Sequence, residues 1–198
     1  MSYLRTAVFL DRDGTVTVER GHVTDPDDLE LIAGAAEAVR SLNSAGLLVV
    51  IVSNQSGVAR GLMTEEELAR IHKRLESLLA SKGARLDGAY YCPNYEGGSV
   101  PGYIEDSSCR KPSTWMVERA CADLSIDGGS SFVVGDQATD IELASNAGIP
   151  GVLVMTGKGE RAEKRLQERG IPVARRARDL SDAVDWILSS VAQREEQD

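Results

Sequence analysis

Short apolar runs alternate along the chain with stretches in which apolar residues recur every three or four positions. The runs predict buried strands at 7–10, 47–52, 89–91, 132–134 and 152–155. The periodic stretches predict helices at 34–45, 64–83, 112–124, 138–147, 160–169 and 180–191. Strands that alternate with helices are typical of a parallel sheet covered on both faces. The pattern therefore predicts an α/β fold, a three-layer Rossmann-like domain with a central parallel sheet.

Two of the predicted helices have clear start signals. Thr64 and Glu67 form a capping box ahead of an apolar helical face. Pro112 fits the first turn of the next helix, because a residue at that position needs no N–H donor. We therefore expect these helices to begin at residues 64 and 112.

Residues 92–109 interrupt the alternation of strands and helices. This stretch is rich in proline and glycine and shows no apolar periodicity, and a loop of this length in a compact domain is usually functional. The rest of the chain predicts a single domain over residues 1–192. We expect a solvated basic loop at 175–178 and a polar, flexible tail at 193–198.

The composition narrows the classes of partner. A net charge of −9 repels nucleic acid and anionic membranes, yet a small anionic substrate needs only local positive charge or a metal ion. The chain shows no secretory leader pattern and no run of about 20 apolar residues, which predicts a cytoplasmic protein without a membrane span. Its three cysteines are too few for a disulfide framework. Cys92 and Cys109 could lie near one another if the loop between them folds back, but a reducing cytoplasm favours two reduced thiols.

Polar side chains follow three of the predicted strands. In an open parallel sheet the carboxyl ends of the strands meet at one edge, where ligands bind. The groups expected at this edge are Asp11 and Asp13 after the first strand, Ser53 and Asn54 after the second, Asp136 and Asp140 after the fourth, and Arg110 and Lys111 before the third helix. Such a set suits phosphoryl transfer, since Mg²⁺ and a lysine together offset the charge of a phosphoryl group that a carboxylate attacks.

Four short motifs strengthen this interpretation. In order along the chain, Asp11-Arg12-Asp13-Gly14-Thr15, Ser53, Lys111 and Gly135-Asp136 with Asp140 resemble the motifs of the haloacid dehalogenase (HAD) superfamily of phosphatases. The resemblance covers residues 7 to about 156 and implies a magnesium-dependent phosphomonoesterase with an aspartyl-phosphate intermediate. It implies that Asp11 is the nucleophile and a metal ligand, and that Asp13 is the acid and base and also binds the metal through its main-chain oxygen. It further implies that Asp136 is a metal ligand and that Asp140 supports the site. Ser53 and Lys111 are implied to bind the transferring phosphoryl group.

A narrower resemblance rests on the stretches 53–61, 91–93, 109–112 and 156–158. These are similar to the branch of the superfamily that includes D-glycero-D-manno-heptose 1,7-bisphosphate 7-phosphatases and histidinol-phosphatases, which lacks a large cap domain. The resemblance implies that the loop 92–109 substitutes for a small cap and that Asn54, Arg60 and Arg110 bind substrate. It also implies removal of the 7-phosphate of the heptose bisphosphate, with histidinol phosphate or another small phosphosugar as the alternative substrate.

Members of this branch hold zinc in the loop with a C-x-H pattern followed by C-x-C. Cys92 and Cys109 match the outer positions, but Asn94 and Ser107 stand where histidine and cysteine are expected. Asparagine and serine are poor zinc ligands, and two thiolates do not complete a tetrahedral site. We therefore predict no bound zinc.

Other classes of protein stay open at this point. Receiver-like signalling domains also carry a phosphorylated aspartate on a parallel sheet, but Asp13 supplies the acid and base that rapid hydrolysis needs. A binding protein that has lost catalysis is disfavoured because every motif is intact. We expect a monomer that acts on a small phosphorylated sugar.

Among the other polar residues, we expect Arg12 to face away from the site or toward the flap after the first motif, His22 to lie in that flap, and His72 to lie on the surface of its helix.

Overall fold

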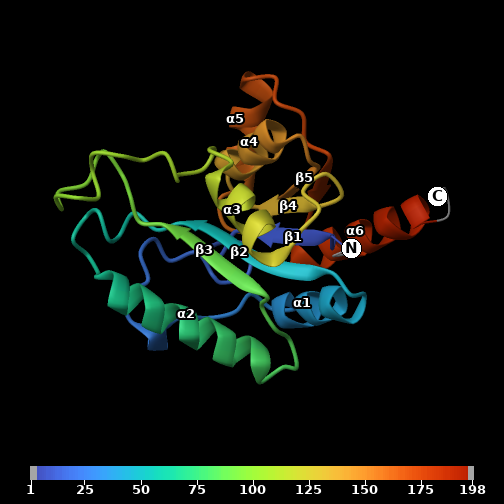
Figure 1. Ribbon diagram of the computed structural model, residues 1–198, viewed down its shortest axis with the longest axis horizontal. Coiled ribbons are helices and arrows are strands. Elements are labelled where there is room, and N and C mark those ends of the chain that lie inside the picture. Colours follow the sequence, from blue (N-terminus) through green and yellow to red (C-terminus); the bar gives the residue numbers. More distant parts are fainter. Residues whose placement is uncertain (1–3, 196–198) are drawn as a thin grey trace.

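The computed structural model describes residues 4–195 and places six strands in one parallel sheet (Figure 1). The strands are β1 (Ala7–Leu10), β2 (Leu48–Asn54), β3 (Gly88–Cys92), β4 (Phe132–Gly135), β5 (Gly151–Val154) and β6 (Arg175–Ala177). This architecture confirms the predicted α/β class. It also adds β6 where a solvated loop was predicted. No apolar run marks β6, because two of its three side chains are exposed arginines and only Ala177 is buried.

Within residues 4–195, five α-helices and one 3₁₀ turn connect the strands, and a sixth α-helix follows β6. They are η1 (Pro26–Asp28), α1 (Ala35–Ser44), α2 (Glu65–Ala80), α3 (Trp115–Leu124), α4 (Ala138–Ala147), α5 (Gly159–Glu168) and α6 (Leu180–Glu195). The predicted capping box opens α2: the hydroxyl of Thr64 accepts the N–H of Glu67, whose carboxylate accepts the N–H of Thr64. The prediction that α3 begins at Pro112 is wrong, because residues 110–113 first form a turn closed by the Ser113 N–H and the Arg110 carbonyl. The sixth helix extends to Glu195, past the predicted start of the tail, and residues 196–198 lie outside the described residues.

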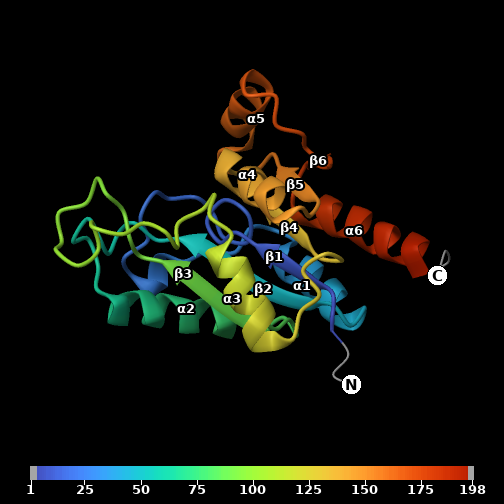
Figure 2. The same ribbon diagram turned by 45° about the horizontal axis from the view of Figure 1, so that its top comes forward.

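Side chains that alternate along each strand enter two different cores. Val8 and Leu10 of β1 pack with residues of α1, α2 and α6, whereas Ala7 and Phe9 pack with α3 and α4 on the opposite face (Figure 2). Each fully buried valine, leucine or phenylalanine side chain stabilises the fold by roughly 1.5–3 kcal/mol. Burial on both faces explains why the strands read as continuous apolar runs.

The strand order decides where a site can form. The order is β3-β2-β1-β4-β5-β6, so the chain leaves β1 toward one side of the sheet and later crosses to the other side through β4. The loops after β1 and β4 therefore diverge and open a crevice between them at the carboxyl edge. Asp11 follows β1 and Asp136 follows β4, which places both aspartates at this crevice.

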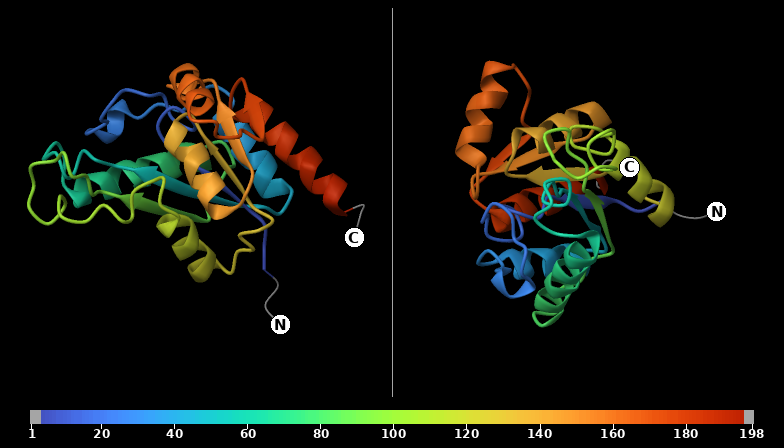
Figure 3. Two further views of the ribbon diagram at one scale, coloured as in Figure 1. Left: turned by 90° about the horizontal axis from the view of Figure 1, so that it is seen from above. Right: turned by 90° about the vertical axis from the view of Figure 1, so that its left-hand side faces the viewer.

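The loop 92–109 projects from the carboxyl end of β3 and lies beside the loop that follows β2 (Figure 3). Its backbone bonds to that neighbour, since the N–H groups of Ser99 and Val100 both donate to the carbonyl of Ala59. A disulfide between Cys92 and Cys109 closes the loop at its base. The expectation of two reduced thiols is therefore wrong. The two cysteines meet because the chain returns to the carboxyl edge of the sheet just before Lys111, whose backbone bonds to Asn54 at the end of β2.

None of the helices within residues 4–195 combines the length and apolar character needed to cross a lipid bilayer.

Candidate active site

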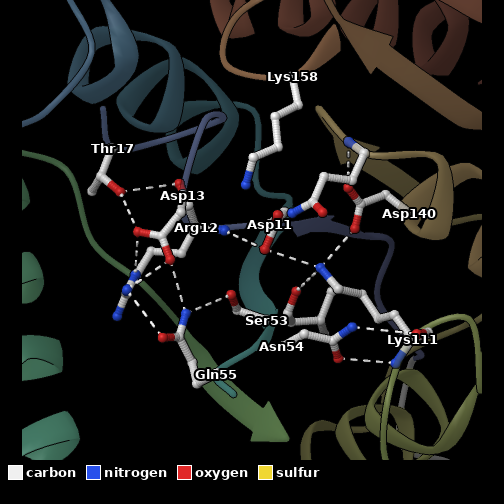
Figure 4. Close-up of polar contacts among 12 residues, drawn as sticks. Asp11, Arg12, Asp13, Thr17, Ser53, Asn54, Gln55, Lys111, Asp140 and Lys158 are labelled. Carbon is white, nitrogen blue, oxygen red and sulfur yellow. Dashed lines mark hydrogen bonds and ion pairs between the residues drawn. The ribbon is translucent and has the colours of Figure 1, made fainter. Parts of the chain in front are cut away.

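Lys111 lies at the centre of the carboxyl edge and joins two of the predicted site residues. Its Nζ is 2.9 Å from Oδ1 of Asp11 and 2.6 Å from Oδ1 of Asp140, and it also donates to the carbonyl of Val52 at 2.9 Å (Figure 4). Burial alone would lower the pKa of Lys111, but the charges of the two carboxylates raise it overall. Lys111 is therefore a permanent buried cation at the centre of an acidic cluster.

The backbone at Lys111 is held by β2. Asn54, the last residue of that strand, accepts the N–H of Lys111 through its side-chain oxygen at 3.0 Å and donates its amide to the Lys111 carbonyl at 3.3 Å. Ser53, one residue earlier, is buried. The structure thus brings the second and third predicted motifs together, and it gives Asn54 a positioning role toward Lys111.

Asp136 completes the acidic cluster. Asp11, Asp136 and Asp140 each offer an oxygen, and these three atoms lie within 4.8 Å of one another. Burial, followed by the negative charges of Asp11 and Asp140, raises the pKa of Asp136 to about 8. Its Oδ1 is buried and has no hydrogen-bond partner within the described part of the chain, while its Oδ2 accepts the N–H of Lys158 at 2.7 Å.

This cluster fits a divalent cation. Carboxylate oxygens are the ligands that Mg²⁺ prefers, and a bound cation would offset the repulsion among the three carboxylates. Asp140 contributes its side chain to this set, whereas the side chain of Asp13 is engaged elsewhere. The ligand role predicted for the main-chain oxygen of Asp13 stays a prediction.

Glycines let the backbone approach Asp136 closely. Gly14 has a φ of 84°, and a Cβ there would lie 2.1 Å from Oδ2 of Asp136. Gly157 has a φ of 55°, and a Cβ there would lie 2.2 Å from the same oxygen. Both positions therefore require glycine, for the left-handed backbone and for the space that the carboxylate fills.

Asp13 projects from the turn after β1 and is held by its own neighbour in the sequence. Arg12 donates to both of its carboxylate oxygens, from Nε at 3.0 Å and from Nη2 at 2.7 Å. The prediction that Arg12 faces away from the site or toward the flap is wrong, because its side chain is only 1% exposed and turns back onto Asp13. No pattern in the sequence marks this contact, since arginines are normally solvated.

A cavity of about 190 Å³ lies over these groups. Asp11, Asp13, Ser53, Asn54 and Arg110 line it, as predicted site residues, and so does His22 from the flap. Several other residues line the cavity without a site role predicted from the sequence, and these are Glu19, Gly21, Gln55, Ser56, Gln137, Thr139 and Lys158. Lys158 is the most informative of these, because its Nζ pairs with Glu19 at 2.8 Å and adds a cation opposite Lys111. Its place in the stretch 156–158 was the available signal.

A second, larger cavity of about 510 Å³ shares Gln137 and Lys158 with the first. Four of its eight lining residues are cationic, namely Arg60, Lys158, Arg161 and Arg165, and Arg60 is placed here rather than in the cavity over Asp11. The guanidinium of Arg60 lies 4.4 Å from the ring centre of Tyr95, and that of Arg110 lies 5.0 Å from the same ring. Tyr95 of the loop 92–109 thus aligns two cations between the cavities.

One further sequence expectation changes with the structure. His72 is not a simple surface residue, because its Nδ1 lies 2.7 Å from the hydroxyl of Tyr91 and its side chain is only 19% exposed. In the loop, the amide of Asn94 donates to the carbonyl of Asp106, and the hydroxyl of Ser107 donates to Glu96 at 2.9 Å.

Known proteins resemble this chain over nearly its whole length. Residues 108–183 match the HAD-hydrolase-like family. A protein of Thermosynechococcus vestitus named D-glycero-D-manno-heptose-1,7-bisphosphate 7-phosphatase is 45% identical over 96% of this chain and 99% of its own length. A Yersinia pestis protein named D-glycero-beta-D-manno-heptose-1,7-bisphosphate 7-phosphatase is 40% identical over 94% of this chain and 91% of its own.

A solved structure is similar in both fold and sequence. It is the D,D-heptose 1,7-bisphosphate phosphatase from B. bronchiseptica, complexed with magnesium and phosphate. It superposes with a TM-score of 0.81 at 31% identity and covers 93% of this chain and 99% of its own. A relative with this fold therefore binds both ions that the acidic cluster and Lys111 are suited to accommodate.

Proposed function

The chain belongs to the HAD-like hydrolase family, and from this premise we propose that it is a magnesium-dependent phosphatase that removes the 7-phosphate of D-glycero-D-manno-heptose 1,7-bisphosphate. The relatives' names supply the substrate. The observation that carries the chemistry is the contact of the buried Lys111 with Asp11, which lines a cavity together with Asp13.

The residues divide the reaction between them. A carboxylate oxygen of Asp11 attacks phosphorus as the bond from phosphorus to the sugar oxygen breaks. The departing sugar oxygen takes a proton from Asp13. Water then gives a proton to Asp13 and attacks the acyl phosphate, which releases inorganic phosphate and restores Asp11. Lys111 and the hydroxyl of Ser53 bind the phosphoryl oxygens, and Asp140 holds Lys111 in place.

Magnesium, when bound by Asp11, Asp136 and Asp140, would neutralise charge on the transferring phosphoryl group. The disulfide between Cys92 and Cys109, together with the bonds that Asn94 and Ser107 make inside the loop, supports the proposal that this chain holds its loop without zinc. A monomeric state and a cytoplasmic location stay predictions.

The second cavity supports a substrate with two phosphates. A heptose bisphosphate that places its 7-phosphate over Asp11 has a second phosphate to accommodate, and the cations that follow along the cavity are Arg110 and Arg60. We expect Arg110→Met to raise KM about tenfold or more for the bisphosphate and to change KM little for a phosphosugar with only the transferred phosphate. Arg119→Met, an exposed arginine on α3, is the matched control.

Phosphate release by the purified protein with Mg²⁺ tests the proposal. Heptose 1,7-bisphosphate, histidinol phosphate and several sugar monophosphates are compared by kcat/KM, and we expect the heptose bisphosphate to lead. Asp11→Asn should abolish release, whereas Asp185→Asn on the exposed face of α6 should not. Preference for histidinol phosphate would replace the substrate assignment. A phosphoprotein that persists after incubation with acetyl phosphate, without turnover of any ester, would favour a receiver-like domain.

A further inference from the structure

Arg12 has a larger volume than any other fully buried side chain among the described residues. Removing a guanidinium from water is costly, and a buried ion pair is often no more stabilising than apolar residues of the same volume. One of its nitrogens, Nη1, is buried without a hydrogen-bond partner. Packing alone is therefore a poor reason for an arginine at this position, and its contacts indicate what it does.

Every polar contact of the Arg12 side chain is made with the active site. Nε and Nη2 form a fork on the two oxygens of Asp13, and Nη2 also donates to Oε1 of Gln55 at 3.2 Å. Gln55 in turn donates from Nε2 to Oδ2 of Asp13 at 2.9 Å and to Oγ of Ser53 at 3.0 Å. A closed set of hydrogen bonds thus links Arg12, Asp13, Gln55 and Ser53 (Figure 4).

The flap after β1 does not depend on this side chain. The turn that starts the flap is held by the main chain, because the carbonyl of Arg12 accepts the N–H groups of Val16 and Thr17, each at 2.9 Å. A different residue at position 12 leaves this carbonyl in place. The side chain and the main chain of Arg12 therefore have separate roles, and the side chain is directed at Asp13.

Three side chains contact the carboxylate of Asp13, and only one of them lines the cavity over Asp11. Arg12 and Thr17, whose hydroxyl lies 3.2 Å from Oδ1, are buried and do not line the cavity over Asp11. Gln55 does line that cavity. A carboxylate offers about four acceptor sites. Arg12 and Gln55 occupy three of them, and the fourth faces the hydroxyl of Thr17, which also lies 3.2 Å from the carbonyl of Arg12. A substrate oxygen can therefore reach Oδ2 only by replacing Gln55.

We propose that Arg12 is a positioning residue that fixes the plane of the Asp13 carboxylate, so that Oδ2 exchanges Gln55 for the leaving oxygen of the substrate. This inference rests on the proposed function, because it assigns Asp13 the proton transfer. A two-point fork on a carboxylate restricts its orientation more than a single hydrogen bond does. Small errors in the placement of a reacting group cost about 10²-fold in rate, which sets the expected effect.

Substrates with different leaving groups separate positioning from a merely structural role. A sugar phosphate leaves as an alkoxide and needs the proton of Asp13, whereas p-nitrophenyl phosphate leaves as a stable phenolate and needs none. For Arg12→Met we expect kcat/KM to fall about 10²-fold with the sugar phosphate and less than about threefold with the aryl phosphate. The aryl phosphate should also give a burst of one equivalent of nitrophenolate, because Asp13 still has to activate water in the second step.

Three further variants make the test decisive. Arg12→Lys keeps the charge but loses the two-point contact with Asp13. Thr17→Val keeps the shape but loses one donor. In both variants kcat/KM should fall more with the sugar phosphate than with the aryl phosphate, by a smaller factor than in Arg12→Met. Arg169→Met removes an arginine from the buried Glu142 on α4, outside the site, and should lower both rates equally or not at all. Equal losses on the two substrates for the Arg12 and Thr17 variants would overturn the inference. If the unmodified protein hydrolyses neither ester with Mg²⁺, the proposed function fails instead.

Discussion

Replacing Asp136 by asparagine tests the electrostatics of the acidic cluster. Burial and the charges of Asp11 and Asp140 raise the pKa of Asp136 to about 8, from an ordinary value of 3.8. Because the folded-state pKa is the higher one, the fold is favoured below the ordinary pKa, and this advantage is lost as pH rises toward 8. At 1.36 kcal/mol per pKa unit, the raised pKa lowers the free energy of unfolding by about 4 kcal/mol at pH 7 and about 2 kcal/mol at pH 5, because Asp136 ionises in the unfolded state and stays mostly protonated in the folded one.

Asparagine removes this cost and keeps the shape of the side chain. Its oxygen can still accept the N–H of Lys158, and its amide nitrogen takes the place of the Asp136 oxygen that has no partner. Without a divalent cation, we therefore expect Asp136→Asn to raise the free energy of unfolding. The gain should be about 2.6 kcal/mol larger at pH 7 than at pH 5.

Magnesium should narrow the stability difference between the two proteins at pH 7 and reverse their order at pH 5. At a concentration 100 times its dissociation constant, Mg²⁺ adds about 2.7 kcal/mol to the unfolding free energy of the protein that binds it. The variant lacks one of three ligands and should gain far less. Urea unfolding at pH 5 and pH 7, with EDTA or with Mg²⁺, measures all four cases, and Asp185→Asn serves as the matched control. A variant less stable than the parent in EDTA at pH 7, or equally stabilised by Mg²⁺, would refute the reasoning.

Two other perturbations probe the buried cation and the loop. Lys111→Met leaves Asp11 and Asp140 without their partner, so urea unfolding should show a loss of about 3–5 kcal/mol and phosphate release should fall below detection. Unchanged stability would contradict the ion pairs described here. Replacing both Cys92 and Cys109 by serine opens a loop with a sequence separation of 17, which should cost about 3 kcal/mol and raise KM for the bisphosphate, because Tyr95 then no longer aligns Arg60 and Arg110. Dithiothreitol should change KM in the same direction in the parent protein and have no effect in the serine variant; an equal response of both would dissociate the effect from this disulfide.

The sequence alone determined the local elements and the position of the chemistry. Apolar runs identified five of the six strands, because four of them are buried on both faces and the edge strand β3 is partly buried. The three-residue edge strand β6 was missed because two of its side chains are exposed arginines. The motifs placed Asp11, Lys111 and Asp136 at one edge, because parallel strands that alternate with helices bring their carboxyl ends together. The roles of these three residues in the reaction stay predictions, which the variants of Asp11, Lys111 and Asp136 test.

Only the tertiary structure decided which side chains meet. The fork from Arg12 to Asp13 depends on how the turn after β1 packs, and the bond from Gln55 to Asp13 spans 42 positions of the sequence. The pairing of Cys92 with Cys109 and the sharing of Tyr95 by two arginines depend on the return path of an irregular loop. Periodicity reports which face of an element is buried. It carries no information on contacts between side chains from different loops, and those contacts arrange the acid, the cation and the second cavity around Asp11.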